Sequence, residues 1–257
     1  MSFKMIKKKI ITIIIVLLWA KLAFAAHPLI TDDTGIQGKG NLQIEINSEF
    51  SSDKEETVEE TGIEAGIGLC YGISDKTDIV LGFPYQWNKV KEDGVITSDE
   101  NGISDMSLEV KHAFYEKDGL SFALKPGISF PTGNDKKGLG AGKSIYSFFF
   151  ITTKEMESGA FHLNMGYVRN ENKADEEENI WHASLASEIE AMQSLKVVGN
   201  IGIEKNADKT KDSNPAFILG GLIYSLKENF DVDFGVKFGL NSTETDNSIL
   251  AGITLRY

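Results

Sequence analysis

The stretch from Asn229 to Tyr257 constrains the fold of this chain more than any other. From Phe230 to Leu240 every second residue is large and apolar, and polar residues or glycine stand between them. This alternation is typical of a β-strand with one apolar face. The run is eleven residues long, whereas strands of soluble sheets usually have about five or six. A tilted strand that crosses a bilayer needs about 9–11 residues, so we expect transmembrane strands.

The same period of two recurs along the chain and predicts twelve strands. We place them near residues 42–50, 62–72, 79–87, 106–114, 120–130, 144–154, 161–167, 181–189, 195–203, 215–225, 230–240 and 249–257. Near 144–154 and 215–225 both faces are apolar, so the facing of these two strands stays open. An even number of antiparallel strands is typical of bacterial outer-membrane barrels. The predicted fold is therefore all-β: a transmembrane antiparallel up-and-down β-barrel of about 12 strands over residues 41–257.

The predicted connectors alternate between short and long. Long ones are expected at residues 51–59, 88–101, 131–143, 170–179, 206–214 and 241–247. Outer-membrane barrels have tight periplasmic turns and longer extracellular loops, so both chain ends are expected in the periplasm. Pro84 and Pro126 fall inside predicted strands, where each removes a ladder hydrogen bond, so we expect bulges or strand ends there.

The first 25 residues are typical of a secretory signal peptide. Lysines precede an apolar run from Ile10 to Ala20, and Ala23-Phe24-Ala25 provides the small residues for cleavage after Ala25. Residues 26–40, rich in glycine and aspartate, are interpreted as an N-terminal periplasmic tether or plug. Fifteen extended residues reach about 50 Å, at about 3.3 Å each, so this segment is long enough to enter the barrel lumen.

The chain ends on an aromatic residue that follows an alternating strand. Tyr257, Leu255 and Gly252 resemble the C-terminal signal by which the barrel-assembly machinery recognises outer-membrane barrels. Without residues 1–25 the chain keeps 21 basic and 38 acidic residues, a formal charge of −17. Such a charge disfavours nucleic acid as a partner. Cys70 is the single cysteine, so no internal disulfide forms.

The polar residues of the predicted strands are expected to line a lumen. The candidates are Glu64, Glu109, Lys111, Lys125, His182, Asp231, Asp233, Lys237 and Arg256. Mixed charge with an acidic excess suggests a narrow wet passage that favours cations or neutral solutes. The alternative is that these charges pair across the lumen and close it. Many lumen positions, among them Gly235 and Gly252, carry no side chain and leave space.

No motif points to catalysis, a cofactor or a metal. The glycine-rich run from Gly138 to Gly142 precedes a strand, whereas a phosphate-binding loop opens a helix. The four histidines are scattered, and His162 and His182 on neighbouring strands either meet by chance or line the lumen. Acidic loops could bind divalent cations that bridge to lipopolysaccharide, or be merely solvated. An outer-membrane hydrolase would need a nucleophile beside a base, and no G-x-S-x-G elbow occurs.

Two short stretches carry a family resemblance. Residues His27 to Gly35 (HPLITDDTG), with Gln37-Gly38-Lys39-Gly40, and Phe130-Pro131-Thr132-Gly133 resemble a bacterial outer-membrane family named for the meta-pathway of phenol degradation. The resemblance implies a transporter of small compounds, aromatic ones among them, and brings no catalytic residues.

We therefore expect a passive channel or uptake protein for small, including aromatic or hydrophobic, molecules in the outer membrane of a Gram-negative bacterium. A closed structural or surface-interaction barrel is the alternative, and a hydrolase is a third. The expected partners are outer-membrane lipid and lipopolysaccharide, the barrel-assembly machinery and a small-molecule solute.

Overall fold

The computed structural model describes residues 27–257. The predicted signal peptide and its cleavage site after Ala25 lie outside the described residues. Within these described residues, thirteen strands and one short 3-10 helix follow each other. They are β1 (Leu42–Glu55), β2 (Val58–Ser74), β3 (Thr77–Glu92), β4 (Val95–Ile103), β5 (Ser107–Lys117), β6 (Leu120–Ser129), η1 (Asp135–Lys137), β7 (Ile145–Met156), β8 (Gly159–Arg169), β9 (Asn179–Met192), β10 (Leu195–Glu204), β11 (Ala216–Lys227), β12 (Phe230–Gly239) and β13 (Asn247–Arg256).

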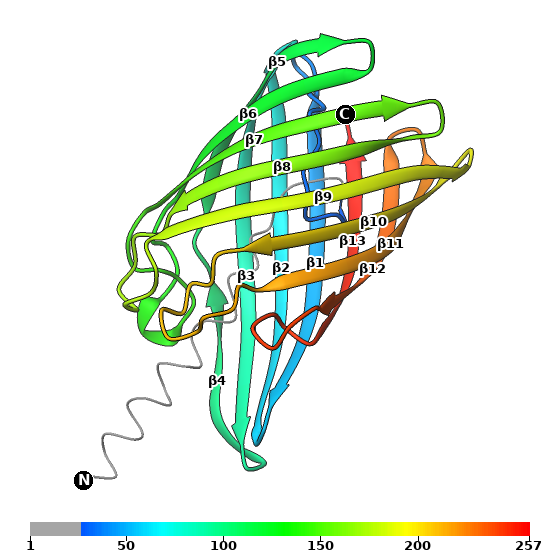
Figure 1. Ribbon diagram of the computed structural model, residues 1–257. Coiled ribbons are helices and arrows are strands. Elements are labelled where there is room, and N and C mark those ends of the chain that lie inside the picture. The colour runs from blue at the N-terminus through cyan, green and yellow to red at the C-terminus, as the bar shows by residue number, and fades with distance from the viewer. Residues whose placement is uncertain (1–26) are drawn as a thin grey trace.

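These strands form one closed antiparallel β-barrel (Figure 1). Apart from β4 and β5, strands that follow each other in the chain pair with each other, and β1 pairs with both β2 and β13, which closes the sheet. β4 and β5 share one position, because β3 pairs with β4 along its second half and with β5 along its first. The barrel thus has twelve positions, and the predicted fold is confirmed. Within residues 27–257, no helix is long and apolar enough to cross a membrane.

Side chains alternate between an apolar outer face and a polar inner face. On β12, Phe234 and Phe238 are half exposed on the outside, whereas Asp233 and Lys237 are buried inside. The wall therefore presents hydrocarbon outward, as a lipid-facing barrel requires. The structure also settles the two strands whose facing stayed open. On β7 and β11 the outward residues include Phe148, Ile218 and Leu222, and the inward ones include Phe149, Phe217 and Leu219.

Turns of two residues follow β2, β5, β7, β9 and β11, at the same end of the barrel as the C-terminus (Figure 1). At the other end, the prediction of long loops at residues 51–59 and 88–101 is wrong. β1 and β2 pair as far as Glu55 and Val58, and β3 and β4 form a second long hairpin. Asp93 and Gly94 both have positive φ (51° and 76°), the geometry of a tight hairpin turn that needs no loop.

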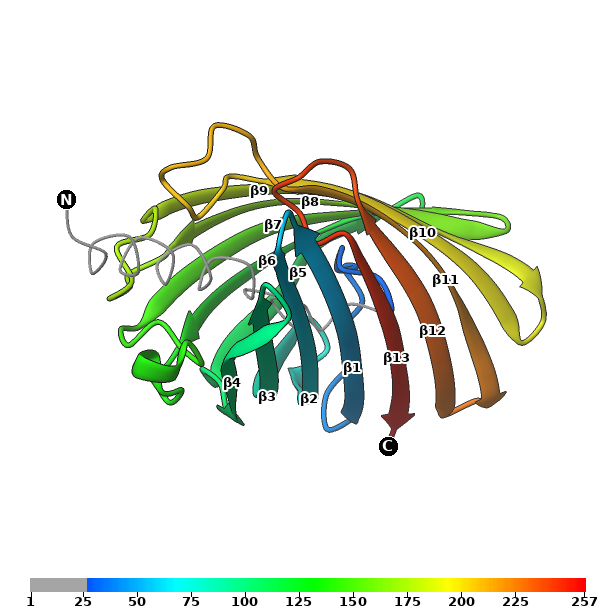
Figure 2. The same ribbon diagram turned by 90° about the horizontal axis from the view of Figure 1, so that it is seen from below.

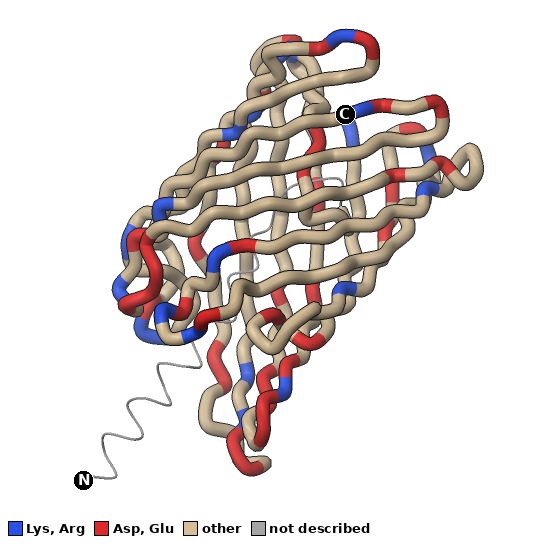
Figure 3. The backbone as a smooth tube through the Cα atoms, viewed as in Figure 1, with Lys and Arg blue, Asp and Glu red and all other residues tan. Residues whose placement is uncertain are grey.

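These two hairpins project beyond the barrel wall (Figure 1). Their tips are rich in acidic residues, which Figure 3 shows in red at the lower end of the molecule. The other connectors at this end, residues 130–144, 170–178, 205–215 and 240–246, are long loops as predicted.

Neither of the two prolines lies at a strand end; each lies inside a strand, where the ladder to one neighbour is interrupted. The carbonyl of Pro84 accepts a hydrogen bond from the N–H of Ser104 (3.0 Å), in the gap between β4 and β5. Pro126 lies where the β5–β6 ladder is interrupted, between the pairs Glu109–Gly127 and His112–Leu124. A missing N–H is tolerated at both places, because the ladder is already broken there.

Candidate functional site: the lumen and the N-terminal segment

Residues 27–37, here called the inner segment, lie inside the barrel. Figure 2 shows the dark blue start of the described chain enclosed by the curved wall. The segment returns to the wall through Gly38, which passes close to Gly72 of β2. A Cβ on Gly72 would be 1.8 Å from the carbonyl oxygen of Gly38. After this passage the N–H of Gly40 donates to the carbonyl of Gly72 (2.8 Å), and β1 begins at Leu42.

The start of the inner segment lies over glycines. His27 is hydrogen-bonded through Nδ1 to the carboxylate of Asp233. A Cβ on Gly252 would stand 2.6 Å from the same nitrogen, and one on Gly235 would stand 2.8 Å from Pro28. These positions therefore lack side chains where the inner segment occupies the space.

Leu29 and its neighbour Ile30 make apolar contacts between the inner segment and the wall. Leu29 is 2% exposed and packs into a cluster of inward-facing apolar residues. The wall contributes Ala186, Val198, Phe217, Leu219, Ile223 and Leu250. Burying a leucine side chain stabilises by about 1.5–3 kcal/mol. The apolar residues on the inner face of β11 thus have a physical reason: they are covered by the inner segment rather than by water.

Polar wall residues hold the backbone of the inner segment. Asn200 of β10 accepts hydrogen bonds from the N–H groups of Ile30 (2.8 Å) and Thr31 (3.0 Å) and donates to the Thr31 hydroxyl (2.7 Å). Further along, the N–H of Thr34 donates to Thr153 of β7 (3.0 Å). These partners satisfy backbone donors that are buried away from bulk water.

Charges anchor the middle of the inner segment. The Asp32 carboxylate lies 3.0 Å from the ammonium groups of both Lys111 and Lys125, with one oxygen toward each. Asp33 adds a second ion pair to Lys111 (3.3 Å), and Glu109 one to Lys125 (3.0 Å). Three of the predicted lumen residues therefore meet at one place.

A second charged group lies toward the long-loop end. The Lys237 ammonium is 2.9 Å from Glu49 and 3.5 Å from Glu244 of the 240–246 loop. Burial raises the pKa of Glu244, although Lys237 beside it acts in the opposite direction. Glu64 accepts a hydrogen bond from the Gln86 amide (3.2 Å) and is buried.

The other predicted residues lie apart from these groups. His182 contacts Glu204 (3.3 Å) and Ser184 (2.9 Å). It does not meet His162, because in the β8–β9 register His182 is opposite Gly166, whereas His162 is opposite Ala186.

The three residues of the predicted assembly signal do not all face the same side of the barrel wall. Arg256, next to this signal, forms an ion pair with Asp231 (2.7 Å). Tyr257 is 68% exposed at the end of the last strand, and Leu255 is on the outward row. Gly252 instead faces the lumen beneath His27.

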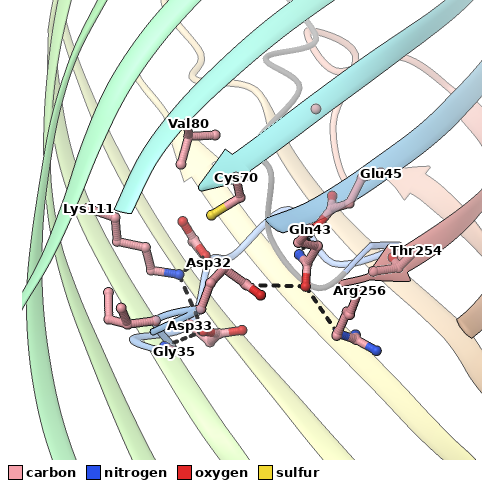
Figure 4. A pocket seen from close by; sticks show the side chains of 13 residues that line it. Asp32, Asp33, Gly35, Gln43, Glu45, Cys70, Val80, Lys111, Thr254 and Arg256 are labelled. Atoms are coloured by element: carbon pink, nitrogen blue, oxygen red, sulfur yellow. Dashed lines mark hydrogen bonds and ion pairs between the residues drawn. The ribbon is translucent and has the colours of Figure 1, made fainter. Parts of the chain in front are cut away.

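A cavity of about 310 Å³ lies beside the inner segment (Figure 4). Asp33, Gln37, Gln43, Glu45, Lys111 and Arg256 are among its lining residues. Figure 4 shows Lys111 pointing at Asp32 and Asp33, and Gln43 between Glu45 and Arg256. Its volume is at the lower end of the range of small-molecule sites, about 300–1,000 Å³. Across residues 27–257, no three His, Cys, Asp or Glu side chains gather closely enough to hold a metal ion.

The sequence reasoning missed how the inner segment is held. Asp32 and Asp33 are the acids of an otherwise uncharged stretch, and Lys111 and Lys125 are among the three lysines assigned to the lumen, so charge complementarity was the signal that could have paired them. Asn200 and the cluster around Leu29 gave no such signal, because polar and apolar residues at single strand positions are common.

Comparisons with solved structures agree on the fold. The structure matches an outer membrane channel from Pseudomonas putida F1 with a TM-score of 0.70 at 10% sequence identity, over 85% of this chain and 96% of that one. The KdgM porin gives 0.54 at 9% identity over 83% and 98%. The translocator domain of the autotransporter NalP from Neisseria meningitidis gives 0.53 at 11% identity over 86% and 89%. The chain thus has the channel-like barrel fold found in outer membranes.

A comparison with curated protein sequences found no match. One family model covers residues 27–257, which is nearly the whole chain and includes both the inner segment and the barrel. The protein therefore belongs to the family described as "Putative MetA-pathway of phenol degradation", the family that the motifs at His27 and Phe130 had indicated.

Proposed function

We propose that this protein is an outer-membrane channel that takes up small molecules, and that the inner segment closes its lumen until it is displaced. The observation that carries the proposal is the inner segment itself, held in a polar lumen by separate contacts to β5, β6, β7, β10 and β12. A barrel of twelve positions is wide enough to leave space that wall side chains do not fill. In this chain the segment occupies part of that space.

Each contact of the inner segment is of a reversible kind. Hydrogen bonds and ion pairs to wall residues can be exchanged for water, and no backbone ladder joins residues 27–37 to a strand. A part of the molecule with few ladder hydrogen bonds opens at lower free energy than the sheet around it. The polar lining that remains after withdrawal suits a water-filled passage.

Single-channel recording in planar bilayers tests this proposal. The mature chain should give small or rare current steps, and a variant lacking residues 28–38 should give larger, stable ones. A matched control is deletion within the β3–β4 hairpin tip, which leaves the lumen intact. Equal conductance of the full chain and the variant lacking residues 28–38 would defeat the proposal.

The alternative is a closed barrel that acts through its surface. The observation that favours it is the pair of acid-rich hairpins that project from the long-loop end (Figure 3). In that case deleting residues 28–38 would produce no current steps. Under either function we propose export to the outer membrane, assembly through the C-terminal strand by the barrel-assembly machinery, and contact of the acidic hairpins with lipopolysaccharide through divalent cations.

A further inference from the structure

Two lysines stand opposite each other on the inner wall. Lys111 is on β5 and Lys125 on β6, and the pair His112–Leu124 fixes the register that puts the two lysines face to face. They are 6% and 3% exposed. Like charges directly opposite on antiparallel strands destabilise a sheet, and burial makes this worse because water screens the charges less. The wall at this point therefore requires an anion between the lysines.

Asp32 is that anion in the structure. Its Oδ1 lies 3.0 Å from Lys111 Nζ and its Oδ2 3.0 Å from Lys125 Nζ, so one carboxylate bridges both lysines. The Asn164 amide lies against the backbone of Asp32; with its oxygen turned to the Asp32 N–H (2.7 Å) and its nitrogen to the Asp32 carbonyl (2.9 Å), it satisfies both groups. The hydrogen bonds from the two lysines to Asp32 are charge-assisted, and such bonds are roughly twice as strong as neutral ones.

The acids of the wall do not replace Asp32. Glu109 pairs with Lys125 (3.0 Å). Asp78 of β3 is opposite Lys111 in the ladder, but its carboxylate accepts from the Gln37 N–H (2.9 Å) and the Cys70 thiol (3.3 Å). Within the described residues, the ion pairs of Lys111 are those with Asp32 and Asp33, both of the inner segment. Withdrawal of the segment thus takes both of these partners from Lys111 and leaves Lys125 paired with Glu109.

We propose that Lys111 and Lys125 form a carboxylate-binding site of the lumen, and that Asp32 occupies it in place of a solute's carboxylate. The inference rests on the proposed channel function and names its solute class, a small organic monocarboxylate. Leu29, three residues before Asp32, covers an apolar patch on the inner faces of β9, β10, β11 and β13. A solute with an apolar body and one carboxylate offers the same two kinds of contact. This class differs from the cations or neutral solutes that the overall acidic lumen had suggested.

Titration calorimetry on the folded chain in detergent tests the site, with benzoate as the probe. The variant Asp32→Asn removes the competing carboxylate and should bind benzoate about tenfold more tightly than the wild type, or better. The neutral isostere benzamide should not bind. Asp93→Asn at the tip of the β3–β4 hairpin is the matched control, because it removes a carboxylate outside the lumen and leaves that of Asp32 between the lysines, and it should behave as the wild type does. Heat-modifiable migration in gels shows that each variant is folded.

The double variant Asp32→Asn/Lys125→Gln should lose benzoate binding. Deleting residues 28–38 empties the site by a second route, and this variant should also bind benzoate more tightly than the wild type and not bind benzamide. The proposal is overturned if Asp32→Asn and the deletion bind benzoate no better than the wild type, or if benzamide binds equally well. Phosphate binding as strongly as benzoate would also overturn it, because the site would then accept any small oxyanion. Binding in detergent needs no passage, so failure here is distinct from failure of the conductance test.

Discussion

Replacing Leu29 by alanine should loosen the inner segment without weakening the barrel. Leu29 is 2% exposed, and its contacts are with wall side chains of the apolar cluster. Leucine to alanine changes in packed cores cost about 2–5 kcal/mol. The segment can shift in a wet lumen and refill part of the gap, so we expect the lower end, about 2–3 kcal/mol. This loss falls on docking of the segment, because no strand ladder is touched.

Amide hydrogen exchange read by mass spectrometry measures the effect. The N–H groups of Ile30 and Thr31 are hydrogen-bonded to Asn200 and exchange when the segment undocks. A loss of about 2–3 kcal/mol corresponds to exchange that is roughly 30 to 150 times faster. Exchange in the strands should not change. Ile36→Ala is the control, because Ile36 borders the cavity rather than the apolar cluster.

Two results would refute this reasoning. If exchange at residues 30–31 is the same in Leu29→Ala and the wild type, the apolar cluster does not hold the segment. If the strands exchange faster as well, the cluster belongs to the stability of the barrel and not to a separable docking step.

Two further substitutions test the facing of the wall and the fit of the segment. Phe234→Arg places a charge on the lipid side near the middle of β12 and should reduce folding stability in lipid vesicles by about 2–4 kcal/mol. Thr254→Arg, at a position that faces the cavity, should fold nearly normally. Equal folding yields of the two variants would contradict the assigned faces. Gly252→Val pushes a side chain against His27 and should speed amide exchange in the inner segment. Gly220→Val puts its side chain into open space and should leave this exchange unchanged. Unchanged exchange in both variants would show that Gly252 is not needed for docking of the segment.

The alternation of single residues was enough to predict the barrel and the facing of its strands other than β7 and β11. In an outer-membrane strand only one face meets hydrocarbon, so the lipid row of β12 is visible in the sequence itself. The rule failed on β7 and β11, where inward residues such as Phe149 and Leu219 are apolar as well. On β11 the reason is the inner segment, since Leu219 is covered by Leu29.

The connectors were predicted less well than the strands. Their polar composition suggested loops at 51–59 and 88–101, yet polar residues at the edge of the membrane continue a hairpin as readily as they form a loop. The dipeptide Asp93-Gly94 is a strong signal for a tight hairpin turn and would have corrected the second case.

The contacts of the lumen lay beyond single-strand reasoning. Lys111 and Lys125 were each assigned to the lumen, but their opposition depends on the register between β5 and β6, which the pattern of one strand does not fix. The bridging Asp32 comes from a segment without periodicity, about 80 residues earlier in the chain.

A reversible cross-link between the inner segment and the wall tests the central claim most directly. Thr34 and Ser121 are hydrogen-bonded through their side-chain oxygens, so cysteines at both positions lie near the separation that a disulfide spans; Cys70→Ser removes the native thiol. Conductance is recorded in a bilayer from the same molecules, first oxidised and then after a reductant is added. The oxidised barrel should show no current steps, and reduction should restore those of the uncrosslinked chain. Equal conductance before and after reduction would show that the segment does not control the lumen.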